Sequence, residues 1–254
     1  MSTPEDAARR IFSERAATYT TSATHSDPQI LARVVELCAP QPQWLALDVA
    51  TGTGHTALAL APHVRAVVGT DLTPAMLAEA ERLRRQRGIA NVSFRVANAH
   101  QLPFAGGSFQ LVTCRRAAHH FSQLAQALGE MHRVLAPGGR LVIDDRSVPE
   151  DDFVDRCMNQ LDWLHDESHV QQYRPSQWRR LLAGAGFNLE LVQPYEQHRP
   201  LSALTAGVSP QNVSRIHAIL DGLTEEQRAK LNLCERDGAP HLTHWYVLLA
   251  AESA

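Results

Sequence analysis

The fold of this chain is decided by residues 44–57, which read WLALDVATGTGHTA. An apolar run ends in Asp48, small residues follow at Ala50, Gly52 and Gly54, and a helical pattern then begins. This order predicts a strand, a tight backbone turn and the N-terminus of a helix. Small residues let the backbone approach a ligand closely, and the free N–H groups of the first helical turn attract negative charge.

A second acidic residue ends the next apolar run of the chain. Residues 66–70 read AVVGT and lead directly into Asp71. In a nucleotide-binding βαβ unit, a carboxylate at this place accepts hydrogen bonds from the ribose. The two segments together predict a site for a cofactor that contains a nucleoside.

Composition and charge narrow the functional classes. The chain has 254 residues, enough for one large domain, and its formal net charge of −3 predicts no basic surface for nucleic acid. Its 4 cysteines are scattered, which argues against a zinc site or a disulfide framework and is typical of a cytoplasmic protein. The sequence has no secretory signal pattern and no apolar run of roughly 18 residues, so we expect no membrane span.

Apolar runs alternate with helical patterns through the first part of the chain. The pattern predicts strands at residues 44–49, 66–71, 92–96, 109–114 and 140–145. It predicts helices near residues 54–62, 74–87 and 121–135. Such alternation is typical of βαβ units and predicts an α/β fold, with a mostly parallel sheet covered by helices on both faces.

The later part of the chain is organised differently. We predict a helix at 177–185, a strand at 187–193, two short helices near 210–221 and 224–231, and a last strand at 244–250. The stretch between the last two strands is too long for a simple hairpin loop. We therefore expect a single domain over residues 1–254, with N-terminal cover helices in 1–43, a cofactor-binding core in 44–146, and lid insertions at 147–173 and 195–242.

The glycine turn by itself fits two cofactors. Residues 52–57 match the G-x-G-x-x-G/A pattern of dinucleotide-binding enzymes and Asp71 takes the acidic position, so an NAD-dependent oxidoreductase is one alternative. Asp48 argues against it, because a carboxylate just before the glycines is unfavourable beside a pyrophosphate. The cationic ammonium and sulfonium groups of S-adenosylmethionine are compatible with that carboxylate.

Several ordered motifs resemble the class I S-adenosylmethionine-dependent methyltransferases, in the branch that includes the ubiquinone/menaquinone C-methyltransferases and many small-molecule methyltransferases. The resemblance covers residue 12 to about residue 193. Residues 48–54 (DVATGTG) are similar to the first motif of that branch, and residues 71–77 (DLTPAML) look like its ribose-binding segment. The other similar segments are Asn98-Ala99, Leu102-Pro103-Phe104, Ser108-Phe109, residues 135–139 (LAPGG) and residues 141–143 (LVI).

Two positions depart from the family's pattern. Asn98 stands where the family often has Asp, and its carbonyl can accept the same hydrogen bond from an adenine amino group. Gln110 stands where the family usually has Asp after Ser-Phe, a position that is more often structural.

The resemblance implies a Rossmann-like sheet of seven strands, mostly parallel, with the last strand antiparallel to its neighbours and a partly helical lid. It implies S-adenosylmethionine as the cofactor and transfer of its methyl group to a small-molecule acceptor. A second alternative is an enzyme that uses the same cofactor for cyclisation or elimination. The cofactor-binding residues that it implies are Tyr19, Asp48, Ala50, Gly52, Gly54, Asp71, Leu72, Met76, Asn98, Ala99 and Arg115.

Two adjacent histidines are the candidates for catalysis. His119 and His120 follow the fourth strand, at the sheet edge where open α/β folds bind their ligands, and imidazole titrates near neutral pH. A general base is required if the acceptor is a neutral alcohol, a phenol or an acidic carbon. Because neighbouring side chains point in different directions, we expect only one of the two to face the acceptor; the alternative is that both bond backbone groups at a helix start.

Three other polar residues have open roles. Asp145, at the end of the fifth strand, can orient a histidine, bind the acceptor or pair with Arg146. His165 and His169 are four positions apart and share a face if they lie on one helix. No strong set of acidic or cysteine partners accompanies them, so we predict a contact with the lid and no metal site.

Overall fold

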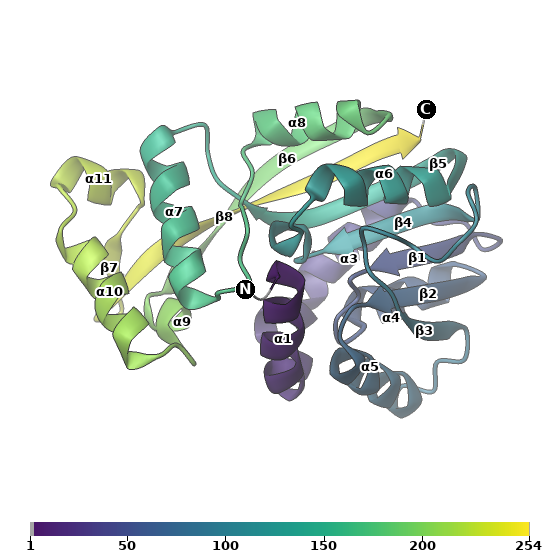
Figure 1. The fold of residues 1–254 in the computed structure, drawn as a ribbon, viewed down its shortest axis with the longest axis horizontal. Coiled ribbons are helices and arrows are strands. Elements are labelled where there is room, and N and C mark those ends of the chain that lie inside the picture. The colour runs from purple at the N-terminus through teal and green to yellow at the C-terminus, as the bar shows by residue number, and fades with distance from the viewer. Residues whose placement is uncertain (1–2, 254) are drawn as a thin grey trace.

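The computed structural model describes residues 3–253 and contains one mixed sheet in the order β3-β2-β1-β4-β5-β8-β6 (Figure 1). The first five strands of this order run parallel. Their bounds are β1 (Leu45–Val49), β2 (Ala66–Asp71), β3 (Val92–Val96), β4 (Phe109–Arg115) and β5 (Leu135–Ser147). The strand β8 (Ala239–Ser253) is antiparallel both to β5 and to β6 (Phe187–Pro200), which confirms the predicted α/β fold and its antiparallel last strand.

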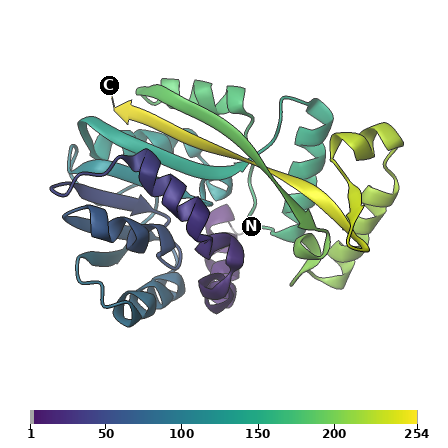
Figure 2. The ribbon, with the colours of Figure 1, turned by 180° about the vertical axis from the view of Figure 1, so that it is seen from behind.

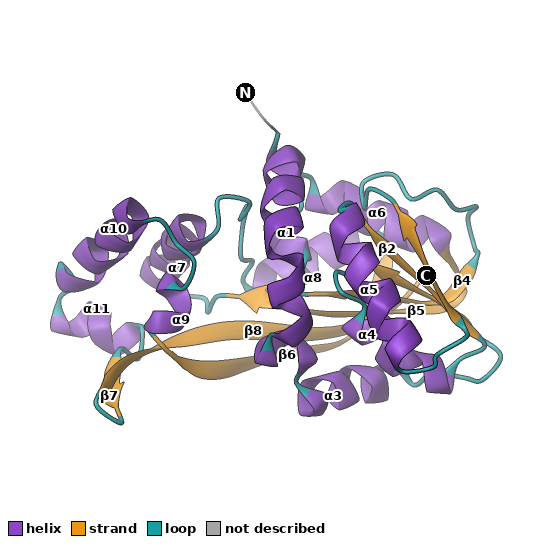
Figure 3. Ribbon diagram, turned by 90° about the horizontal axis from the view of Figure 1, so that it is seen from below, coloured by secondary structure: helices purple, strands orange, loops and turns teal. Residues whose placement is uncertain are grey.

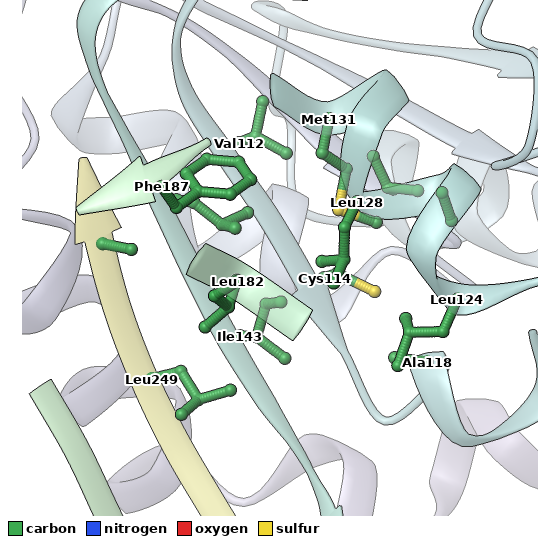
Figure 4. Packing of buried hydrophobic residues seen from close by; sticks show 14 of the residues in the cluster. Val112, Cys114, Ala118, Leu124, Leu128, Met131, Ile143, Leu182, Phe187 and Leu249 are labelled. Atoms are coloured by element: carbon green, nitrogen blue, oxygen red, sulfur yellow. The ribbon is translucent and has the colours of Figure 1, made fainter. Parts of the chain in front are cut away.

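Side chains of alternating residues cover the two faces of the parallel strands. On one face, Leu47 and Val49 of β1 pack with α6 (Leu124–Val134) and α8 (Pro175–Gly184). Figure 4 shows this cluster, with Leu128 and Met131 of α6 and Leu182 of α8 against the sheet. On the other face, Ala46 packs with α3 (Pro28–Cys38) and α4 (His55–Leu60). Because both faces are buried, these strands are continuous apolar runs.

Three strands are longer than the sequence predicts. We expected 140–145, 187–193 and 244–250, whereas β5, β6 and β8 extend well beyond those ranges. Residues 195–200 and 239–242, which we assigned to a lid insertion, continue β6 and β8. A further short strand, β7 (Cys234–Arg236), pairs with β8 and was not predicted. Strand β6 alternates between exposed and half-buried residues beyond Leu191, so no apolar run marks its length.

The far ends of β6 and β8 carry a separate group of helices (Figure 2). These are α7 (Asp152–His165), α9 (Ser202–Thr205), α10 (Pro210–Asp221) and α11 (Glu225–Lys230). They share their own apolar cluster, which includes Met158 and Leu161 of α7 and Ile216 of α10. This helical extension, residues 152–165 and 202–230, therefore has a core distinct from the two that cover the sheet.

The N-terminal helix α1 (Pro4–Thr21) lies between the helical extension and α5 (Pro74–Gln86), as Figure 3 shows. The Thr20 hydroxyl donates a 3.0 Å hydrogen bond to Glu79 of α5. At the opposite side, Arg15 lies 3.8 Å from Asp166, just after α7. The short α2 (Ala23–Ser26) follows α1. Among the described helices, none has the length and apolar character needed to cross a membrane.

Candidate functional site

The loop after β1 requires its glycines for two different reasons. Gly52 and Gly54 have φ values of +54° and +84°, in the left-handed region that favours glycine. A Cβ on Gly54 would lie 3.0 Å from the Ala80 side chain and 3.1 Å from the Phe94 ring, so this glycine lets the loop pack against α5 and β3. A Cβ on Gly52 would project into open space within the cavity above the loop.

Asp71 holds the glycine loop and the start of α5 together. One carboxylate oxygen accepts a 2.9 Å hydrogen bond from the Gly52 N–H, and the other accepts a 2.8 Å bond from the Thr73 N–H. Burial raises the pKa of Asp71, although these hydrogen bonds act in the opposite direction. Each carboxylate oxygen can accept more than one hydrogen bond, so the group keeps capacity for ligand hydroxyls.

Asp48 lies below the same loop and is fully enclosed. Its two oxygens accept hydrogen bonds from the hydroxyls of Thr51, at 2.5 Å, and Thr113, at 2.7 Å. Burial raises the pKa of Asp48 to about 6, against the opposing effect of the two hydroxyls and Arg115. Asp48 therefore connects the loop after β1 to Thr113 of β4.

These residues line a concave site, which we call the cofactor cavity. It is bounded by the loop after β1, the start of α5, the residues after β3 and β4, and α1. All the residues predicted for cofactor binding lie in its wall except Gly54, which packs underneath. Those in the wall are Tyr19, Asp48, Ala50, Gly52, Asp71, Leu72, Met76, Asn98, Ala99 and Arg115.

Arg115 presents an unsatisfied donor to this cavity. Its Nε donates to the Thr56 hydroxyl at 2.9 Å, and one terminal nitrogen donates to the His25 carbonyl at 2.5 Å. The other terminal nitrogen, Nη1, is buried and has no hydrogen-bond partner among residues 3–253. A buried guanidinium with a free N–H is an unfavourable arrangement that an anionic ligand group would correct.

A second concave site adjoins the first, and we call it the acceptor cavity. Five residues line both: Phe12, Tyr19, His25, Arg116 and His120. Its remaining wall comes from α1, the ends of β5, β6 and β8, and the helical extension. The side chains of these five residues therefore separate the two cavities, and a ligand in either cavity can contact them.

His119, in the wall of the acceptor cavity, forms a buried pair with Asp145 behind it. The Nδ1 of His119 lies 2.5 Å from Asp145 Oδ1, and the His119 backbone N–H donates to Oδ2 at 3.2 Å. Burial lowers the pKa of His119 well below its ordinary value, and the neighbouring His120, His169 and Arg146 lower it further. In the neutral ring, Nδ1 carries the proton because it faces a carboxylate. Its Nε2 is left with a free lone pair and no partner among the described residues.

The side chains of His119 and His120 do not diverge as we expected. Their ring centroids lie 4.0 Å apart, because both residues belong to a tight 3-10 turn, Ala118–His120, and not to an α-helix start. His120 Nδ1 lies 3.0 Å from the Ser168 carbonyl oxygen, so it donates to the backbone of a distant segment. His120 reaches both cavities, whereas His119 lines only the acceptor cavity.

The two spaced histidines occupy different local structures. α7 ends at His165, whose Nδ1 lies 2.7 Å from the Leu204 carbonyl oxygen. His169 lies beyond the helix, with Nε2 2.9 Å from Asn159 Oδ1. They therefore do not share a helix face. No group of three or more His, Cys, Asp or Glu residues in the described chain is arranged to hold a metal ion.

Arg116 is a residue of the site that the sequence did not single out. Its backbone has a φ of +55°, and its Nε donates to Asp144 at 3.0 Å. A terminal nitrogen donates to the Tyr195 hydroxyl at 2.9 Å, and the guanidinium lies 3.7 Å from the centre of the Tyr246 ring. This network joins β4, β5, β6 and β8 at the boundary of the two cavities. Only its place directly after Arg115 at the end of a strand could have indicated it.

Gln110 also has a defined role. Its side-chain oxygen accepts a 3.0 Å hydrogen bond from the Leu45 N–H at the start of β1. The residue thus connects β4 to β1 and takes no part in the site, as predicted.

Comparison with known proteins agrees with this architecture. Residues 47–143 match the family model described as a methyltransferase domain. An uncharacterized methyltransferase of Bacillus subtilis, YcgJ, is 36% identical over 184 residues, which are 72% of this chain and 73% of that protein. A demethylmenaquinone methyltransferase of Thermus thermophilus is 46% identical over 114 residues, or 44% of this chain and 51% of that protein.

Solved structures support the same assignment. A provisionally assigned methyltransferase from Bacillus halodurans C-125 superimposes with a TM-score of 0.84 at 32% identity, covering 87% of this chain and 97% of that chain. The crystal structure of Bacillus subtilis YcgJ gives a TM-score of 0.82 at 29% identity, covering 88% and 97%. The oxidoreductase alternative that the glycine pattern allows is therefore wrong. This chain belongs to the class I S-adenosylmethionine-dependent methyltransferases.

Proposed function

We propose that this methyltransferase acts on a small-molecule acceptor held in the acceptor cavity, with His119 as the general base. The observation that carries the proposal is the buried His119–Asp145 pair beside a cavity that shares a wall with the cofactor cavity. The acceptor cavity is a concave site and not the open, basic surface that a polynucleotide would need. Concave sites of this kind are typical of small-molecule binding.

The cofactor cavity fits S-adenosylmethionine. Asp71 is the group for the ribose hydroxyls, and the free N–H of Arg115 is the group for the carboxylate of the methionine part. The open space above Gly52 leaves room for the cofactor, which a Cβ there would fill. When bound, S-adenosylmethionine supplies an electrophilic methyl group on a cationic sulfur.

His119 would remove the proton of the acceptor. Its Nδ1–H is held by Asp145, so Nε2 is the atom that accepts a proton from an acceptor hydroxyl, phenol or acidic carbon. The buried Asp145 carboxylate then stabilises the imidazolium that forms. His120 and Phe12, whose rings meet edge to face at 5.0 Å, close the space around the reacting atoms and exclude water.

A transfer assay tests this proposal. The protein is incubated with S-adenosylmethionine labelled in its methyl group and a panel of small phenols, hydroxyquinones and dicarbonyl compounds, alongside nucleic acid and protein substrates. We expect label in a small-molecule product, together with S-adenosylhomocysteine in equal amount. Label confined to macromolecules, or release of methylthioadenosine without an acceptor, would contradict the proposal.

A further inference from the structure

The acceptor cavity contains one arginine without an ionic partner among residues 3–253. Arg199 of β6 lines this cavity and does not line the cofactor cavity. It is half-buried, and no carboxylate among residues 3–253 lies within ion-pair distance of it. An arginine directed into an enclosed space without such a partner is an available anion-binding group.

The other arginines of the acceptor cavity are already neutralised by carboxylates. Arg116 pairs with Asp144 at 3.0 Å. Arg15 lies 3.8 Å from Asp166, and Arg146 pairs with Asp162. Asp145, which is buried behind His119, accepts hydrogen bonds from the ring and backbone of His119 and from the Arg146 N–H. Among the described residues, Arg199 is therefore the arginine of this cavity whose charge no carboxylate neutralises.

Two residues of the acceptor cavity have buried polar atoms without hydrogen-bond partners among residues 3–253. These atoms are the Nε of Arg146 and the hydroxyl of Tyr246. Tyr246 is fully buried, and its ring centre lies 3.7 Å from the Arg116 guanidinium. Burial raises the pKa of Tyr246, but Arg116, Arg146 and Arg199 outweigh it, so the pKa of the phenol is lowered. The phenol therefore lies within the electrostatic field of Arg199.

We propose that the acceptor is a hydroxylated carboxylic acid whose carboxylate binds to Arg199 in the acceptor cavity. This inference rests on the proposed function, because the acid that binds to Arg199 is the acceptor that is methylated beside His119.

The charge count favours a carboxylate over other anions. One unpaired arginine matches a group with a single negative charge, whereas a phosphate monoester carries nearly two at pH 7. A neutral acceptor would cover Arg199 without giving it an ionic partner, which is unfavourable. The planar guanidinium also matches the geometry of a carboxylate.

Binding measurements without turnover test the inference. The full-length protein is saturated with S-adenosylhomocysteine and titrated calorimetrically with para-hydroxybenzoate, protocatechuate and para-coumarate, and with the carboxamide of each. We expect at least one carboxylate to bind more tightly than its carboxamide, on the order of tenfold to a hundredfold. Arg199→Gln should abolish this preference, and Arg199→Lys should restore part of it.

The matched control is Arg236→Gln, which removes the same charge from an exposed residue of β7 outside both cavities. It should leave the preference unchanged. Equal binding of acids and amides, the absence of binding by every acid, or an unchanged preference in Arg199→Gln would overturn the inference. Methylation of uncharged acceptors alone would refute the inference and leave the proposed function intact. Tight binding of the acids without any methyl product would refute the proposed function and leave the carboxylate site at Arg199 intact.

Discussion

His119 Nδ1 lies 2.5 Å from Asp145 Oδ1, and these two residues join the turn after β4 to the end of β5. Asp145 is fully buried, and its oxygens accept hydrogen bonds from His119 and from the Arg146 N–H. The pair fixes both the orientation of the imidazole and the nitrogen that carries its proton. Its free Nε2 can therefore take up a proton from a ligand in the acceptor cavity.

Asp145→Asn tests this arrangement. An amide in place of the carboxylate can donate to Nδ1, which moves the histidine proton to Nε2 and removes the free lone pair. We expect kcat to fall by about 10²–10⁴ while the affinity for S-adenosylmethionine is unchanged. The measurements are steady-state rates with any acceptor that the wild-type protein methylates, and calorimetric titration of the cofactor. A rate within about tenfold of the wild type would show that Asp145 does not position the base.

Gly52→Val separates backbone strain from loss of space for the cofactor. Its φ of +54° makes any side chain unfavourable, and the valine would also project into the cofactor cavity. We expect the variant to lose S-adenosylmethionine binding. The control is Gly138→Val, since Gly138 has a φ of +69° and equally open surroundings but lies outside the cavity. Both variants should lose roughly 1–2 kcal/mol of stability, but only the first should fail to bind; normal binding would refute the loop assignment.

Asp71→Ala tests the ribose site. The change removes a carboxylate that lines the cofactor cavity, so S-adenosylmethionine binding should weaken by about 1.5–3 kcal/mol. Glu235→Ala is the control, because it removes the same charge from an exposed residue of β7. Calorimetric titration measures both. Equal affinity in a folded Asp71→Ala protein would exclude this residue from the site.

A buried histidine predicts a pH dependence of stability. Burial lowers the pKa of His244 well below its ordinary value, and both of its ring nitrogens lack partners among the described residues. As the pH falls below about 6.5, the unfolded chain takes up a proton that the folded protein does not, so stability is lost. His244→Phe should reduce the slope of the unfolding free energy against pH by up to about 1.4 kcal/mol per pH unit.

Urea unfolding between about pH 7.5 and pH 5.5 measures that slope. The control is His217→Gln, an exposed residue of α10 that loses little hydration on folding. An unchanged slope in His244→Phe would mean that the pKa of His244 is the same in the folded and unfolded protein.

The cofactor half of the molecule was accessible from the sequence because its signals are local. The glycine loop, Asp71 and the residues after β3 each follow a recognisable strand, and they meet at one edge because the strands are parallel. The extent of β6 and β8 was not accessible. The outer part of β6 is half-exposed and largely polar, and pairing with β8, a strand far away in the chain, holds it in the sheet.

The charges of the acceptor cavity illustrate the same limit. Asp145 was expected to orient a histidine or to pair with Arg146, and both options fitted the sequence. Arg146 pairs instead with Asp162 of α7, a helix that the sequence did not predict. Arg199 and Tyr246 attracted no attention, because their shared surroundings arise from the register of β6 and β8.

The central claim is tested most directly by single-turnover methyl transfer in His119→Asn, with His120→Asn alongside it. With an acceptor that the wild type methylates, we predict that His119→Asn slows transfer by about 10²–10⁴ with little change in cofactor affinity. His120→Asn should have a smaller effect, because its Nδ1 is bonded to the Ser168 carbonyl and the residue closes the wall between the cavities. Transfer by His119→Asn within about tenfold of the wild-type rate would contradict the account, since alignment alone would then suffice for the reaction.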